Sequence, residues 1–223
     1  MKKIILLTVA MVLVASTVFA WTIVGSRHDL SNAGVAGGQV CVFCHTPHNA
    51  NTSQGPLWSH SASAATFSIY ASATLNGTIT QPAGVSKACM GCHDGTIAVG
   101  AVAFGRSAGS LATTGHDNAQ SYAAGSAMSN GAQAGNPLLG TDLRDDHPVS
   151  ITYVPGSGLG QDPELRTNTG SSVVGTVTVQ LFGTAAPYTV ECGSCHDVHN
   201  NTAVPFLVTS NTNSQICTAC HLK

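Results

Sequence analysis

All eight cysteines of this 223-residue chain lie in four copies of one pattern, Cys-x-x-Cys-His. The copies are CVFCH at 41–45, CMGCH at 89–93, CGSCH at 192–196 and CTACH at 217–221. Two thiols on one short turn can form thioether bonds to the two vinyl groups of a haem, and the adjacent histidine can then bind the iron from the same side. The pattern therefore predicts four covalently attached haem c groups.

Each predicted haem takes its covalent bonds and its first axial ligand from one motif. The thioether bonds are expected from the eight cysteines: Cys41, Cys44, Cys89, Cys92, Cys192, Cys195, Cys217 and Cys220. The iron ligands on the attached side are expected to be the motif histidines: His45, His93, His196 and His221.

Three other uses of paired cysteines explain less of the pattern. Disulfide bonds are common in exported chains, but they do not require a histidine after every second cysteine. Structural zinc sites also use Cys-x-x-Cys pairs, but they do not require that the histidine be adjacent. A thioredoxin-like redox motif normally occurs once, within a βαβ unit, and the sequence shows no such unit.

Six further histidines are available to bind the four irons from the opposite side. The two methionines beyond residue 20 are poor candidates, because Met90 lies between the cysteines of its own motif and Met128 lies in a stretch rich in Gly, Ala and Ser. An iron with two histidine ligands lacks the methionine that raises the reduction potential. We therefore expect low-potential haems whose irons have no open position for a substrate.

Four of these six histidines are the expected distal ligands: His28, His48, His147 and His199. The other two, His60 and His116, are expected to be exposed or hydrogen-bonded instead. His48 and His199 each lie three residues after a motif histidine, and three residues span at most about 10 Å. That is too short to reach the opposite side of the same iron, so each must bind a different haem, or none. For His199 the nearest haem in sequence is the one expected on CTACH.

The first residues, 1–20, have the character of a secretory leader, with a basic start, an apolar run and small residues at the end. Cleavage there would leave an exported chain that begins at Trp21, and no later stretch has the about 18 apolar residues of a membrane span. Without Lys2 and Lys3, the chain has six basic and ten acidic residues and is therefore net negative. A negative net charge argues against a nucleic-acid partner. We expect one tetrahaem domain over 21–223, exported through the periplasm.

Few residues suit a conventional hydrophobic core, since 5% are aromatic and small residues are abundant. Residues 100–140 show no helix or strand period and are expected to be irregular. Apolar and polar residues alternate in SSVVGTVTVQLF at 171–182, as they do in a β-strand, and again in YTVEC, which follows after a short gap. A small β-hairpin is therefore predicted near 173–192. The expected fold is a mostly irregular multihaem cytochrome fold, organised around a stack of four haems, with short helical turns and low secondary structure.

The motifs together resemble those of the multihaem c-type cytochromes of metal-reducing bacteria, including the doubled pattern of cytochrome c3-like domains. The resemblance rests on HDLS at 28–31, CVFCHTPHNAN at 41–51, PLWSH at 56–60, CMGCHDGTIA at 89–98, DHPVS at 146–150 and CGSCHDVHN, FLV and CTACH within 192–221. Four haems on an exported chain of this length are similar to the tetrahaem cytochromes that polymerise into extracellular filaments. That resemblance implies a continuous stack of bis-histidine haems, in which parallel and T-shaped neighbours alternate, and it favours the same four distal histidines.

The leading expectation is an electron-transfer protein, secreted or at the cell surface, that forms a homopolymer. By the same resemblance, one axial histidine would cross between subunits, with His48 as the first choice and His28 as the second. The other partners would be redox cytochromes and extracellular acceptors such as metal oxides. A soluble periplasmic tetrahaem shuttle is the alternative. A haem enzyme would need an iron with an open position, and six spare histidines for four irons argue against one.

Overall fold

The computed structural model describes residues 23–30, 39–102, 110–112, 121–123, 137–168, 173–174 and 179–222. For 110–112, 121–123 and 173–174 the description covers the backbone. The leader expected at 1–20, His116 and Met128 lie outside the described residues.

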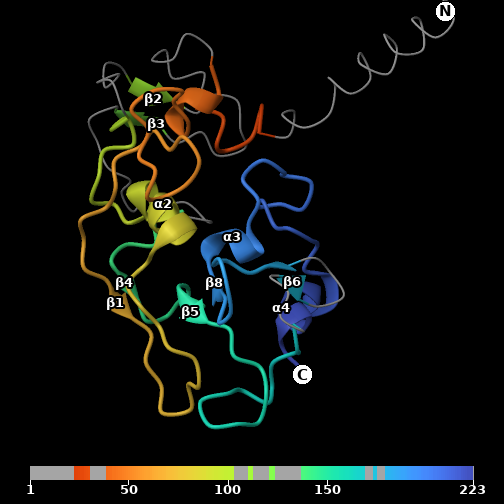
Figure 1. Cartoon of the computed structure of the whole chain (residues 1–223). Helices are drawn as coiled ribbons and strands as arrows, with labels where there is room; N and C mark the ends of the chain where they lie inside the picture. The colour runs from red at the N-terminus through yellow and green to blue at the C-terminus, as the bar shows by residue number, and fades with distance from the viewer. Residues whose placement is uncertain are drawn as a thin grey trace, which may run out of the picture.

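Four short helices carry the four motifs (Figure 1). They are the 3-10 helix η2 (Cys41–Phe43), α2 (Gly84–His93), α3 (Cys192–Cys195) and α4 (Gln215–Cys220), and the 3-10 helix η3 (Thr212–Ser214) precedes the last of them. Residues three apart on a helix share a face, so one turn places both cysteines of a motif on the same side. The expectation of short helical turns is confirmed.

The described strands have two or three residues each and pair in two-stranded sheets. The parallel pair is β1 (Ser68–Ile69) with β4 (Asp142–Leu143). The antiparallel pairs are β2 (Ser110–Ala112) with β3 (Ser121–Ala123), β5 (Ile151–Thr152) with β8 (Thr189–Val190), and β6 (Val173–Val174) with β7 (Val179–Gln180). The β5–β8 pair matters most for the site, because β8 leads directly into α3 (Figure 1).

The strand expected over 171–182 is divided in the structure. β6 and β7 both lie within it and pair with each other, while Phe182 forms an antiparallel bridge with Thr189. The hairpin expected near 173–192 is thus formed in part, because β8 takes β5 as its partner strand. Val179 and Leu181 are buried, at 2% and 1% exposure, as the alternation predicts. An alternating pattern specifies which side chains face inward, but it does not specify the partner strand.

The stretch 100–140 contains one regular feature that the sequence did not predict. β2 and β3 both fall within it and form an antiparallel pair. The expectation of irregular chain is therefore wrong for these six residues. Their weak strand pattern, SLA and SYA, consists largely of small residues, and such residues give little periodic signal.

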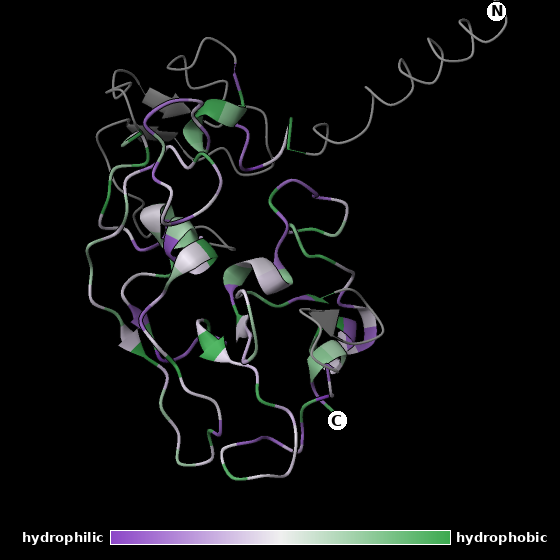
Figure 2. Cartoon of the chain, in the orientation of Figure 1, coloured by the Kyte–Doolittle hydropathy of each residue, from purple (hydrophilic) through white to green (hydrophobic). Residues whose placement is uncertain are grey.

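Two small clusters of buried apolar residues lie next to motifs. Phe67 and Leu143 pack with Met90, which lies inside the second motif. Tyr153, Val179 and Leu181 pack with Ala219, which lies inside the fourth motif. Figure 2 shows short apolar stretches dispersed along the described chain rather than gathered in one block.

The low content of regular secondary structure agrees with the expected irregular fold. Among the described residues, no helix is both long enough and apolar enough to span a membrane.

Candidate haem sites

Two segments of similar sequence fold alike around their motif histidines. We call residues 41–59 the first module and residues 192–208 the second module. Matching backbone hydrogen bonds, given with the N–H donor first, are Thr46–Leu57 and Ser59–Cys44 in the first module and Asp197–Phe206 and Val208–Cys195 in the second, at 2.8 to 2.9 Å. Leu57 and Phe206 each follow a proline, and their φ angles are 55° and 58°.

Hydrogen bonds to proline carbonyl oxygens orient three of the motif histidines. Nδ1 of His45 lies 2.9 Å from the carbonyl oxygen of Pro56, and Nδ1 of His196 lies 3.0 Å from that of Pro205. In the second motif, Nδ1 of His93 lies 2.6 Å from a proline carbonyl oxygen, that of Pro137. A carbonyl oxygen only accepts, so each Nδ1 must donate its proton. Nε2 then carries the lone pair that can bind a metal, and the hydrogen bond fixes the ring orientation.

Two pairs of histidine rings lie at the centre-to-centre spacing of axial ligands. The ring centres of His28 and His93 are 6.1 Å apart, with an angle of 83° between the ring planes. The ring centres of His45 and His199 are also 6.1 Å apart, with an angle of 17°. Two imidazoles that bind one metal ion from opposite sides through bonds of about 2 Å have ring centres about 6 Å apart. Each pair therefore fits one iron.

The His28–His93 pair is the more buried of the two. Burial, together with the neighbouring His93 and His196, lowers the pKa of His28 to about 4. Burial also lowers the pKa of His93. Phe206 of the second module stacks on the His28 ring, with centres 4.6 Å apart. These surroundings favour neutral imidazoles, the form that binds a metal.

The eight cysteines are all free thiols in this structure. Burial raises the pKa of Cys44 to about 11 and that of Cys92 to about 12. A hydrogen bond with Cys89 lowers the pKa of Cys192 to about 7. Because Cys89 and Cys192 belong to different motifs, this contact places the attachment points of the second and third haems side by side.

The structure separates the other histidines by their surroundings. His60 is 3% exposed, and its Nε2 lies 3.2 Å from the carbonyl oxygens of Ala98 and Val99, as expected for a hydrogen-bonded residue. His48 is exposed. His147 is also exposed, and its Nδ1 lies 3.0 Å from the carbonyl oxygen of Pro148.

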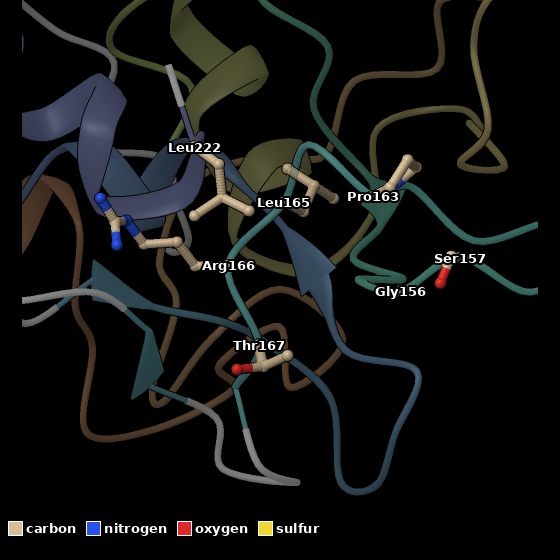
Figure 3. Close-up of a pocket in the computed structure, with 7 residues that line it drawn as sticks. All are labelled: Gly156, Ser157, Pro163, Leu165, Arg166, Thr167 and Leu222. Atoms are coloured by element: carbon tan, nitrogen blue, oxygen red, sulfur yellow. The ribbon is translucent and has the colours of Figure 1, made fainter.

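A cavity of about 460 Å³ lies beside the fourth motif, and its lining includes Leu165, Arg166 and Leu222 (Figure 3). Leu165 forms an antiparallel bridge with His221, and Nε of Arg166 donates to the carbonyl oxygen of Thr218 at 2.7 Å. Apolar side chains suit the edge of a porphyrin, and a guanidinium suits a propionate.

Two features around the first module also fit a porphyrin with propionates. Within the described residues, the buried amide of Gln54 and Nε1 of Trp58 have no hydrogen-bond partner, and the Trp58 ring lies 6.2 Å from that of His45. Both groups can donate to a carboxylate. Leu57 is 52% exposed although it follows the proline that binds His45, which suits an apolar side chain that a haem would cover. The residues present therefore fit haem c.

Sequence reasoning missed these supporting groups. Spacing does not signal the proline carbonyl acceptors, because Pro56 lies eleven residues after His45 and Pro205 lies nine residues after His196. Three buried carboxylates, Asp29, Asp94 and Glu191, carry no recognisable sequence signal. The fourth motif is the nearest one to His199 in sequence, whereas in the structure the His199 ring lies 6.1 Å from that of His45 in the first module.

Residues 186–223 match a protein-family model described as the doubled CXXCH motif. No curated protein matches the chain. The matched region contains the third and fourth motifs, and the match supports a multihaem c-type cytochrome with covalently bound haem c. It likewise supports a role in electron transfer.

Proposed function

We propose that this protein is a tetrahaem c-type cytochrome that carries electrons over long distances as an extracellular filament. The two opposed histidine pairs, His28–His93 and His45–His199, carry the proposal, because each has the ring spacing of two axial ligands. An iron held between two imidazoles exchanges one electron without opening a coordination position. The filled positions argue against an enzyme that binds its substrate at iron.

These distances support two ligand pairs. His28 binds opposite His93 and His199 binds opposite His45. The motif histidines His196 and His221 then need partners, and His48 and His147 are the remaining expected ligands. Since His28 has its partner within the same chain, it is no longer the second choice for a crossing ligand.

We assign His147 to the third motif. It lies three residues before Ser150, whose hydroxyl donates to Oε2 of Glu191 at 2.8 Å. Glu191 directly precedes Cys192. Three residues of chain span at most about 10 Å, and this connection through Ser150 and Glu191 supports His147 as the ligand opposite His196.

His48 is left for His221, and we assign this pairing to two copies of the chain. His48 occupies the same position in the first module as His199 does in the second, and His199 reaches a motif other than its own. His48 is exposed and lies in the motif closest to the N-terminus, whereas His221 lies in the last motif. A head-to-tail contact of this kind does not close on itself and generates a filament.

The filament would receive electrons from redox cytochromes and deliver them to external acceptors such as metal oxides. Its export rests on the leader at 1–20. Electron microscopy of the secreted fraction tests the assembly: filaments of this chain are expected, and a monodisperse periplasmic protein would favour the shuttle instead.

Spectroscopy tests the sites themselves. With two histidines on each iron, the reduced protein should be low-spin throughout and should not bind carbon monoxide rapidly. A clear high-spin signal in the native protein would show an open iron and reopen the case for an enzyme.

A further inference from the structure

Three carboxylates are buried in the described part of the chain, and all three lie around the second motif. Asp29 follows His28, Asp94 follows His93, and Glu191 contacts helix α2; their exposures are 4%, 3% and 5%. No described lysine or arginine is buried. The most buried histidine pair is thus surrounded by negative charge without a buried cation.

Three hydroxyl groups hold the buried carboxylate of Glu191 through hydrogen bonds. Its Oε2 accepts from the hydroxyls of Ser86 at 2.5 Å and Ser150 at 2.8 Å, and its Oε1 accepts from Thr189 at 2.8 Å. The Ser86 hydroxyl also accepts from the backbone N–H of Cys192 at 2.9 Å, so its one proton is left for Glu191. Three hydroxyl donors on two oxygens satisfy an ionised carboxylate.

Asp94 is held in the same way. Its Oδ2 accepts from the hydroxyls of Ser63 and Thr96, and its Oδ1 accepts from the backbone N–H of Thr96 at 2.8 Å. The Ser63 hydroxyl accepts in turn from the N–H of Ala65 at 3.1 Å, so it must donate to Asp94. Among the described residues, neither Asp94 nor Glu191 forms an ion pair with a lysine, arginine or histidine.

We propose that Asp94 and Glu191, with Asp29, lower the reduction potential of the haem bound between His28 and His93. This inference rests on the proposed function. Burial alone would favour the ferrous iron, because the ferric state carries an additional positive charge that water stabilises. The buried carboxylates oppose that effect by stabilising the ferric state.

The closeness of these carboxylates to the second motif allows an order-of-magnitude value for the effect. Asp94 is adjacent to His93, and Ser86, which contacts Glu191, lies three residues before Cys89 on α2. A unit charge on the order of 10 Å from the iron, at an effective dielectric constant of about 20, changes a one-electron equilibrium about tenfold.

These charges matter because the second and third sites are neighbours. Cys89 and Cys192 are in contact, and Ser86 links α2 to α3 through Glu191 and Cys192. A buried site of raised potential between other sites would retain the electron. Asp94 and Glu191 prevent this by keeping the buried site close in potential to the others.

A redox titration of the holoprotein, followed by visible absorbance, tests the inference. Asp94→Asn should favour reduction at one of the four sites about tenfold, which is about 59 mV for one electron, with all irons still low-spin. Glu191→Gln should act in the same direction. Glu191→Asp keeps the charge and should stay near the wild-type curve, as should Asp145→Asn, which changes an exposed carboxylate.

His28→Met identifies the affected site, because a methionine ligand raises the potential of that haem alone. In the His28→Met protein, that haem should titrate as a separate step at higher potential. Adding Asp94→Asn should then shift this step. If Asp94→Asn or Glu191→Gln matures with four low-spin haems and the wild-type curve, the inference is wrong. Wild-type protein that lacks four bis-histidine haems would instead refute the proposed function.

Discussion

The first and second modules have the same local structure but different surroundings. In both, a motif histidine donates through Nδ1 to a proline carbonyl oxygen, and the residue after that proline has a positive φ. The third residue after the motif histidine is an exposed histidine in both modules, His48 and His199. The ring of His199 lies 6.1 Å from that of His45 in the first module.

This difference separates what a motif determines from what its neighbours determine. Local sequence fixes the turn, the tautomer of the motif histidine and the outward direction of the histidine that follows. The tertiary arrangement decides which iron that second histidine meets. Under the proposed function, the same module would close a site within the chain in one case and offer a ligand to another copy in the other.

The largest effect is expected from removing the ligand that joins the modules. His199→Ala should leave the first haem attached but five-coordinate, because His45 loses its opposing imidazole. About one of four haems should become high-spin and bind carbon monoxide. His116→Ala, outside the described residues, is the control and should leave the spectrum unchanged.

His48→Ala tests the other module. Filaments should be lost or shortened, and about one haem per chain should lose its low-spin ligation, because His221 of a neighbouring copy would lack its partner. Electron microscopy and visible spectroscopy on the same sample check this. Normal filaments with all irons six-coordinate would rule out His48 as the crossing ligand.

Two matched glycine variants, one in each module, compare how well the modules pack. Their effect on stability is expected to be smaller than the effects above. Both Leu57 and Phe206 have a positive φ, which glycine adopts without strain. Leu57 is 52% exposed apart from any haem that would cover it, so Leu57→Gly should cost less than Phe206→Gly, about 1 to 2 kcal/mol. Phe206 is 6% exposed and stacks on His28, so Phe206→Gly should cost about 3 kcal/mol. Equal melting temperatures for the two variants would show that the modules are equivalent in packing.

The smallest effect is expected outside both modules. A hydrogen bond from Arg144 lowers the pKa of Asp142 from 3.8 to about 2. Any stabilisation is then present above the usual pKa and lost as the pH falls through about 2. Since the pair is exposed, Arg144→Gln should barely change the melting temperature at pH 6, less so in high salt, and less still at pH 2. A large change at pH 6 would show that the pair contributes more than an exposed ion pair should.

Much of the local structure could be predicted from the sequence, because the signals are short-range. The four motifs mark the helical turns that carry the cysteines, and the hydrogen-bonded state of His60 was expected. The alternation of Val179 and Leu181 predicted their burial. These features depend on residues only a few positions apart.

The partners across the fold could not be predicted in this way. His199 faces His45 because the second module packs near the first, and sequence distance pointed to a different motif. Glu191 lies in the alternating segment YTVEC, which gives no sign that its carboxylate has partners. In the structure it accepts hydrogen bonds from the hydroxyls of Ser86 and Ser150. Such contacts arise only when distant segments meet.

The central claim is that four motifs hold four haems, and the intact mass of the mature protein tests it most directly. The mass should equal the polypeptide from Trp21 plus four haem groups, with every cysteine in a thioether bond. A protein matured in a competent host that carries fewer than four haems would contradict the account.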